Sequence, residues 1–241
     1  LIRWYWCGVL GELYSSAVET RFAKDLPEIL RWMESDTEPT TIQDANFIPN
    51  RLLTLKSRNS AAYKGLSALL LRDNGLDFVT GEPVEEQMYA DSKIDIHHIF
   101  PADWCDKHGI DRHHRDCVVN KTPLSARTNR SISNNAPSLY VTRIEREISP
   151  ARMDEILRSH IIDPQLLRTD QFERFFELRK HALLERIERA FLPVGVLCFR
   201  SEIPRLLGPA GQSGNRQLSV QLAHRNGQFH LQFRRPDRHR R

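Results

Sequence analysis

The chain is organised around two segments, Ile94-Asp95-Ile96-His97-His98-Ile99-Phe100-Pro101 and Asn120-Lys121-Thr122-Pro123-Leu124-Ser125-Ala126-Arg127-Thr128-Asn129-Arg130. The first is a short run rich in β-branched residues, which predicts a strand that stops at Pro101 and carries two adjacent histidines, His97 and His98. Because neighbouring side chains of a strand diverge, one imidazole can bind a metal ion while the other faces a water molecule beside it. Metal-assisted hydrolysis requires that arrangement.

The second segment adds two carboxamides, Asn120 and Asn129, to the two imidazoles. The preceding Val118-Val119 pair predicts a strand that leads to Ser125, and Ser125 is a good N-cap for a short helix carrying Asn129. Strand, loop, strand and helix would then form one small unit that holds a metal ion.

At these residues the sequence resembles the HNH, or ββα-metal, nucleases. Their signature is an acid or His followed by His-x-x-Pro, then a central Asn, then Asn or His on the helix. The resemblance implies that His97 and Asn129 are metal ligands, that His98 is the general base, and that Asn120 braces the loop that carries the base. Many relatives have Asp or Glu at the first position. Mg²⁺ or Mn²⁺ is the expected ion. Because an imidazole is a softer ligand than a carboxylate, Zn²⁺ or Ni²⁺ stays an alternative.

The wider chain, from Arg3 to about Ala190, looks like the C-terminal half of bacterial GmrSD-type restriction proteins, which join a ParB-like nucleotidase to an HNH domain. The phrases that carry this resemblance are Arg3-Trp4-Tyr5-Trp6-Cys7-Gly8, Asn120 to Arg130, and Asn135-Ala136-Pro137-Ser138. It implies an upstream nucleotidase domain or partner that this sequence does not contain. The start at Leu1 instead of Met is what a fragment or a truncated reading frame would show.

The composition limits the classes of protein to which this chain can belong. With 241 residues, of which 40% are hydrophobic and 27% charged, the chain can bury a real core. It has no apolar run long enough to span a membrane, and its four scattered cysteines fit a protein of the reducing cytoplasm. The net charge of +4 is weak evidence for nucleic-acid binding, because residues 191–241 alone carry +7. Any DNA-facing surface of the body is therefore local, and Lys121, Arg127 and Arg130 could hold phosphates there.

The predicted fold class is α+β and predominantly helical, with the ββα-metal core embedded among helices. Four regions follow: a helical packing layer at 1–75, the nuclease core at 76–145, C-terminal helices at 146–190 that pack on the core, and an Arg-rich tail at 191–241. In the first region one aromatic helix is expected through Leu13 and Val18, and a second opening at Asp25 with Pro27 in its first turn. Further helices are expected from near Asn59, and after capping residues that include Ser149, Asp163 and Asp170.

The tail contains a hairpin signal at 217–234. Leu218, Val220 and Leu222 alternate with polar residues, Asn226-Gly227 supplies a tight turn, and an alternating run follows. A two-residue loop at 226–227 pairs 222 with 231 and 220 with 233. A lone hairpin is only marginally stable, so a tail without an evolved role is an equal alternative.

Two segments bear on whether the chain binds structural zinc. Many HNH nucleases have a Cys-x-x-Cys zinc clamp before the His-His strand. This chain has Asp77 and Thr80 at the equivalent place, so the resemblance does not imply a structural zinc there. The neighbouring helices are expected to hold the fold instead. Between the motif segments the pattern Cys105-x2-His108 with His114-x2-Cys117 would suit a zinc knuckle. The favoured interpretation is a solvent-exposed loop in which His and Cys accumulate by chance.

The leading hypothesis is a DNA endonuclease that restricts invading, modified DNA. Two alternatives stay open: a non-catalytic DNA-binding or assembly module whose Cys105–Cys117 loop holds zinc, and an RNA-cutting effector with the same chemistry. A fold-level likeness cannot choose between DNA and RNA.

Overall fold

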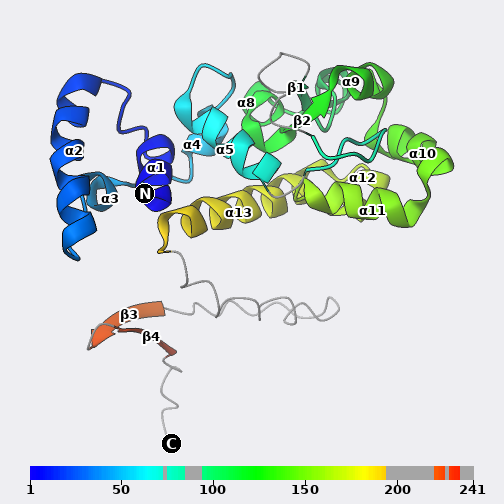
Figure 1. The fold of residues 1–241 in the computed structure, drawn as a ribbon. Helices are drawn as coiled ribbons and strands as arrows, with labels where there is room; N and C mark the ends of the chain where they lie inside the picture. The colour runs from blue at the N-terminus through cyan, green and yellow to red at the C-terminus, as the bar shows by residue number, and fades with distance from the viewer. Residues whose placement is uncertain (73–74, 85–93, 194–219, 226–227, 234–241) are drawn as a thin grey trace, which may run out of the picture. The chain divides into compact units, whose positions relative to one another are not determined.

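The computed structural model describes residues 1–72, 75–84, 94–193, 220–225 and 228–233, and its chain divides into two units, Leu1–Leu197 and Cys198–Arg241. The first unit begins with five helices (Figure 1): α1 (Ile2–Leu10), α2 (Val18–Glu34), α3 (Thr40–Asp44), α4 (Arg51–Thr54) and α5 (Ala61–Arg72). In the described ranges no helix is both long and apolar enough to cross a bilayer.

The central part of the first unit contains its two strands. Strand β1 (Ile94–His98) is followed by α7 (Ala102–Lys107), α8 (Arg112–Asp116) and the 3₁₀ turn η1 (Val118–Asn120), and then by β2 (Lys121–Ser125) and α9 (Ala126–Ile132). The strands pair antiparallel, with His97 opposite Thr122 and His98 opposite Lys121. Helix α9 packs on both strands. The predicted order of strand, loop, strand and helix is therefore present. The second strand begins only at Lys121, however, because Val118 and Val119, which were expected to form its start, lie in the 3₁₀ turn η1.

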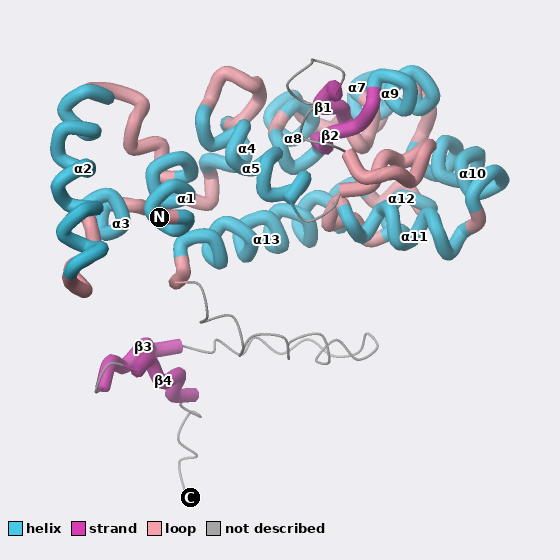
Figure 2. The backbone as a smooth tube through the Cα atoms, in the orientation of Figure 1, coloured by secondary structure: helices cyan, strands magenta, loops and turns pink. Residues whose placement is uncertain are grey.

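Four further helices complete the first unit: α10 (Pro137–Ile148), α11 (Pro150–Ser159), α12 (Pro164–Arg168) and α13 (Phe172–Phe191). The long helix α13 runs along the base of the unit from α12 to α1 (Figure 2). Its Phe175 ring lies 4.9 Å from the ring of Phe100, which lies two residues after the end of β1. This fully buried contact fixes the end of the strand that carries the two histidines.

The second unit contains the predicted hairpin. Strands β3 (Val220–Arg225) and β4 (Gln228–Phe233) pair antiparallel, with Leu222 opposite Leu231 and Val220 opposite Phe233. The predicted register is confirmed. The turn at 226–227 and the rest of the tail lie outside the described residues.

The N-terminal helices differ from the prediction. The first helix ends at Leu10, and α2 begins at Val18 and runs through Pro27 without interruption. A mid-helix proline removes one backbone hydrogen bond. The carboxylates on both sides of Pro27, those of Asp25 and Glu28, accept hydrogen bonds from Thr41 and Thr40 of α3. The predicted connector at 34–50 also contains a helix, α3.

Several local cap predictions are confirmed and one is wrong. Ser125 caps α9 through Thr128 N at 3.1 Å, and Asp163 caps α12 through Gln165 N at 3.0 Å. Asp170 does not form the expected capping box of α13. Its carboxylate instead accepts hydrogen bonds from the backbone N–H and the hydroxyl of Ser138, at the start of α10.

His160 is a fully buried residue that connects three segments of the core. Its Nε2 lies 2.7 Å from the carbonyl oxygen of Leu76, to which it donates, and its Nδ1 lies 2.6 Å from the hydroxyl of Thr122 on β2. Burial, together with the nearby Arg179 guanidinium, lowers the pKa of His160 from 6.5 to about 4, although the bond to Leu76 opposes the shift. The folded protein therefore holds this imidazole neutral at pH 7.

Acidification should destabilise the protein through His160. The folded pKa is below the unfolded one, so the contribution of His160 is complete above pH 6.5 and is lost as the pH falls toward 4. That loss amounts to roughly 3 kcal/mol. Urea unfolding of wild type and His160→Gln between pH 7.5 and 4.5 measures this loss. The free energy of unfolding should fall much less steeply with decreasing pH in the variant than in wild type. Equal slopes in the two proteins would assign the pH dependence to other groups.

Candidate active site

His98 is the best-defined member of the site. Its side chain is about a quarter exposed, and its Nε2 lies 3.2 Å from Oδ1 of Asp116, the last residue of α8. An ionised carboxylate can only accept, so Nε2 carries the proton of this hydrogen bond and Nδ1 of the neutral ring keeps a lone pair. Burial and the neighbouring Lys121 ammonium lower the pKa of His98, although Asp116 opposes the shift. The ring is therefore neutral near pH 7 and can accept a proton.

Asp116 was not predicted as a site residue. Both of its carboxylate oxygens also accept from Arg115, at 2.8 Å, and Arg115 in turn donates to Asp106 at 2.6 Å. The hydrogen bonds from Arg115 lower the pKa of Asp116 to about 2, against the opposing effect of burial. Asp116 is thus ionised and fixed in position behind His98. Nothing in the sequence around it indicates this role, because the contact depends on how α8 folds back toward β1.

Asn120 holds the surroundings of His98 together. It is fully buried, and its Oδ1 accepts from Phe100 N while its Nδ2 donates to Phe100 O, both at 2.9 Å. The same Nδ2 donates to the carbonyl of Arg115 at 3.0 Å. One side chain therefore fixes both the backbone after β1 and the residue next to Asp116. These contacts agree with the bracing role expected for Asn120, and its part in catalysis stays a prediction.

His97 and Asn129 lie on elements that pack together. His97 is half-buried, and its Nε2 is shielded from solvent. On the paired strands it shares a face with the buried Thr122, whereas His98 shares the other face with Lys121. Asn129 is half-buried and lies one turn into α9, which packs on both strands. The two expected ligands thus belong to directly contacting elements.

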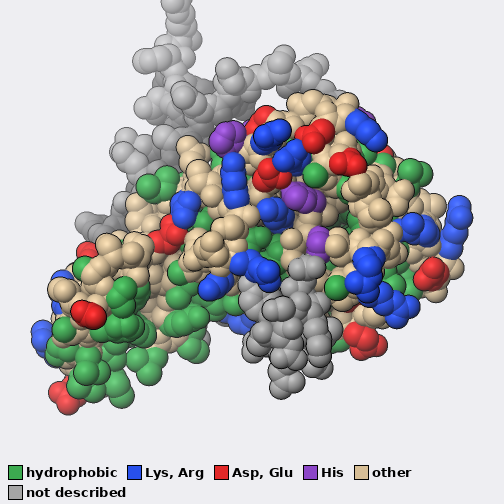
Figure 3. Space-filling model, turned by 90° about the horizontal axis from the view of Figure 1, so that it is seen from above, with side chains coloured by type: hydrophobic (Ala, Val, Ile, Leu, Met, Phe, Trp, Pro, Cys, Tyr) green, Lys and Arg blue, Asp and Glu red, His purple; other side chains and the backbone are tan. Residues whose placement is uncertain are grey.

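The three cations predicted to hold phosphate are not equivalent. Lys121 is half-buried and donates to the carbonyl oxygen of Lys56 at 2.9 Å, and burial lowers its pKa. Arg127 and Arg130 are exposed on α9. The space-filling view shows His side chains with Lys and Arg side chains around them (Figure 3). Of the three, Arg127 and Arg130 are the more accessible to a phosphate.

The segment between the motif strands is not the solvent-exposed loop that was predicted. It folds into α7 and α8, and the Cys105 and Cys117 thiols are fully buried. Cys105 Sγ lies 3.5 Å from the carbonyl of Phe100, and Cys117 Sγ lies 3.4 Å from that of His114. His108 stacks on Trp104, with the ring centroids 3.8 Å apart. Within the described ranges, no group of three or more His, Cys, Asp or Glu side chains is arranged to hold a metal ion.

Asp77 has a larger structural role than the sequence indicated. Its buried carboxylate accepts from Thr80 N at 3.1 Å and Ser125 N at 2.9 Å, and from the hydroxyl of Thr128. It therefore ties the 77–81 turn to the first turn of α9. The expectation that helical neighbours alone hold this part of the fold needs correction, because a carboxylate makes the connection itself.

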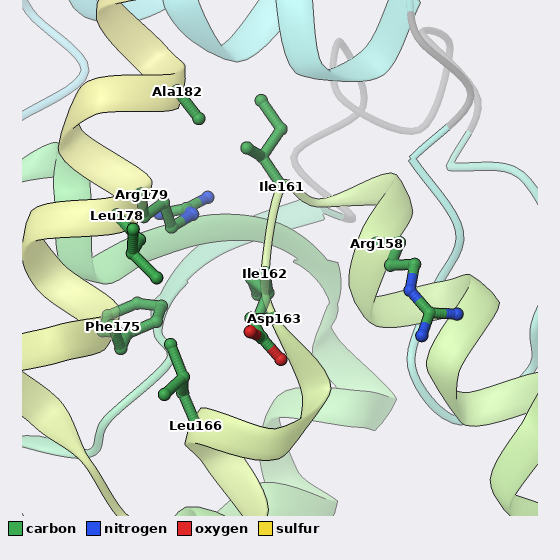
Figure 4. A pocket seen from close by; sticks show the side chains of 9 residues that line it. All are labelled: Arg158, Ile161, Ile162, Asp163, Leu166, Phe175, Leu178, Arg179 and Ala182. Carbon is green, nitrogen blue, oxygen red and sulfur yellow. The ribbon is translucent and has the colours of Figure 1, made fainter. Parts of the chain in front are cut away.

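Arg179 is a second unpredicted support. This fully buried side chain of α13 donates from Nη1 to the carbonyls of Val119 and Lys121, and burial lowers its pKa to about 9. It fixes the backbone on both sides of Asn120. Arg179 also lines a cavity of about 220 Å³ (Figure 4), whose other lining residues are Arg158, Ile161, Ile162, Asp163, Leu166, Phe175, Leu178 and Ala182. None of the predicted site residues lines this cavity.

Comparison with known proteins gives one relative and no function. An archaeal protein of Methanocaldococcus jannaschii, described as "Uncharacterized protein MJ0686", is 29% identical to this chain over 213 aligned residues. The alignment covers 77% of this chain but only 36% of that protein, so the chain spans about a third of the relative's length. No family model matches the sequence. No solved structure matches it significantly.

Proposed function

We propose that this chain carries a metal-dependent endonuclease site that hydrolyses phosphodiester bonds of DNA. The observation that carries the proposal is the fixed position of His98, which has an ionised carboxylate behind it and a buried Asn120 bracing its strand. Ordinary packing does not need a partly exposed histidine held in one tautomer by a carboxylate that is itself held by an arginine. A general base does need it.

In this mechanism His98 removes the proton of the attacking water. The Nε2–H group donates to Asp116, so the lone pair of Nδ1 is the one that accepts the proton. The imidazolium that forms is stabilised by the adjacent Asp116 carboxylate. The depressed pKa of His98 keeps the base in its neutral, competent form at pH 7.

His97 and Asn129 are the residues that would hold a divalent ion in this proposal. One imidazole nitrogen and one carboxamide oxygen are neutral donors, and they lie on packed elements of the ββα unit. Such a set leaves most of the coordination to water and to the substrate phosphate, as is usual for Mg²⁺. The ion would supply charge stabilisation for the phosphorane and the leaving oxygen.

DNA is the proposed substrate, held by phosphate contacts from Arg127 and Arg130, with Lys121 closer to His98. Contacts of this kind position a duplex without reading its sequence, so specificity would come from elsewhere. The resemblance to GmrSD-type proteins suggests restriction of modified DNA in the cytoplasm and an upstream nucleotidase domain or partner.

The metal ligands can be tested separately from the base. His97→Ala and Asn129→Ala should each lower divalent-ion affinity by roughly 10- to 100-fold, because each removes one of the two proposed protein ligands. Calorimetric titration with Mn²⁺ gives the affinity, and plasmid cleavage at rising Mn²⁺ concentration gives the activity. Excess metal should partly restore cleavage by either variant.

Asn134→Ala provides the matched control. Asn134 is an exposed asparagine just after α9, and it donates to Asp103 and not to the site. It should leave the ion affinity unchanged. Wild-type affinity in both His97→Ala and Asn129→Ala would remove these residues as ligands. If the protein cuts a matched single-stranded RNA as fast as it cuts DNA, the site is not selective for DNA.

A further inference from the structure

Helix α2 has its apolar side facing solvent. Five large side chains at helical spacing are 40–71% exposed; they are Val18, Phe22, Leu26, Leu30 and Met33. Steps of three and four residues place them in one stripe along the helix. Hydrophobic side chains gather at the end of the first unit that α2 occupies (Figure 3).

The one fully buried side chain of α2 is an acid, Asp25, and not an apolar residue. Asp25 is 1% exposed and accepts from Thr41 Oγ1 at 2.6 Å, from Trp4 Nε1 at 3.3 Å and from the hydroxyl of Tyr14. Glu28 accepts from the backbone N–H of Thr40 at 2.7 Å and so satisfies the first turn of α3. Hydrogen bonds therefore attach this part of the helix, together with the half-buried Ile29 and Trp32 and the contact of Phe22 with the Tyr14 ring. A surface helix of a soluble protein normally has the opposite orientation.

The size of the stripe matches what a pair of copies needs. Its five side chains expose on the order of 500 Å², near the upper end of the largest apolar patch on a typical monomer. Two such stripes packed face to face would bury about 1,000 Å² in total, which reaches the lower bound for a specific protein interface. An isologous contact uses the same patch twice, so the stripe needs no surface from another protein.

The charges of α2 argue against lipid or nucleic acid as the occupant. The helix carries Arg21, Lys24 and Arg31 but four acidic residues, Glu19, Asp25, Glu28 and Glu34. Helices that bind a membrane surface have a polar face rich in Lys and Arg, and phosphate backbones need net positive charge. A protein surface of apolar character remains.

We propose that α2 is the contact helix of a homodimer, in which the stripes of two copies pack against each other across a two-fold axis. This inference does not depend on the proposed nuclease function. Sedimentation and light scattering of the 241-residue chain at roughly 50 µM should give close to twice the 28.1 kDa chain mass, which corresponds to a dissociation constant in the low micromolar range or below.

Leu26→Glu tests the surface directly. It should weaken dimerisation by at least about 30-fold, because the buried charge occurs twice in a symmetric interface. Leu30→Glu is a second variant with the same expectation, and Glu preserves helix propensity in both. Leu139→Glu is the matched control, since Leu139 on α10 is 63% exposed and Leu26 is 64% exposed. Circular dichroism verifies that each variant is folded.

The outcomes separate clearly. Selective dissociation of folded Leu26→Glu or Leu30→Glu, with Leu139→Glu still dimeric, supports the proposal. A wild type that stays monomeric at this concentration overturns it. Variants of α2 that dimerise as tightly as wild type also overturn it, because the contact would then lie elsewhere.

Discussion

His98→Ala is expected to reduce DNA cleavage by a factor of about 10² to 10⁴, the usual cost of removing a general base. The binding of metal and DNA should remain close to wild type. His98 contacts Asp116 and lies on the opposite strand face from His97, so its removal takes away a proton acceptor and not a ligand. Supercoiled plasmid with Mg²⁺ or Mn²⁺ measures the rate, and titration of a labelled duplex at several salt concentrations measures binding.

His181→Ala is the control for this prediction. His181 lies on α13 with its side chain 78% exposed and its nearest acidic partner, Glu185, at 3.5 Å. Its replacement should leave the rate unchanged. If His98→Ala cuts as fast as wild type while both bind DNA equally, the assignment of the base is wrong. If neither protein cuts with any divalent ion, the non-catalytic alternative gains.

The parts of the fold that were predicted correctly depend on interactions between residues close in sequence. Ser125 and Asp163 cap helices through backbone N–H groups two or three residues ahead. The hairpin register at 220–233 follows from a two-residue turn and strict alternation. In each case the sequence spacing alone determines the geometry.

The errors have a common physical cause, since a distant partner determines the outcome in each. Asp170 binds Ser138 in place of the N-terminus of α13. Helix α2 continues through Pro27, its acids bind α3, and Leu30 and Met33 face outward. Cys105 and Cys117 fill core positions and do not form a loop. Sequence spacing contains no information on which segment will lie across from a side chain.

The residues of the candidate site also fall into a group that was predicted and a group that was not. The motif places His97, His98, Asn120 and Asn129 on a strand, a turn and a helix that come together. The residues that hold these groups in position, which are Asp116, Arg179 and Asp77, come from segments outside the two motif ends. They could not be predicted because a supporting carboxylate or guanidinium has no characteristic neighbours in sequence.

Asp77→Ala is expected to lower the free energy of unfolding by about 3–5 kcal/mol, because it leaves several buried donors without an acceptor. These donors include Ser125 N, Thr80 N and the hydroxyl of Thr128. Burial raises the pKa of Asp77, but the hydrogen bonds lower it by a larger amount, so the pKa lies below the ordinary value of 3.8. The carboxylate is therefore ionised at neutral pH. Its stabilisation is present above the unfolded pKa and is lost as the pH falls through the folded one.

The same substitution should also weaken the metal site, because Asp77 connects the first turn of α9 to the 77–81 turn and Asn129 lies one turn further along α9. Urea unfolding followed by tryptophan fluorescence at pH 7 gives the stability, and Mn²⁺ titration of the folded protein gives the affinity. Asp163→Ala is the control, since it removes an exposed acidic cap of α12 and should cost only about 1 kcal/mol without changing ion affinity. Equal losses of stability in the two variants would show that Asp77 is an ordinary cap and that other contacts hold α9 against the strands.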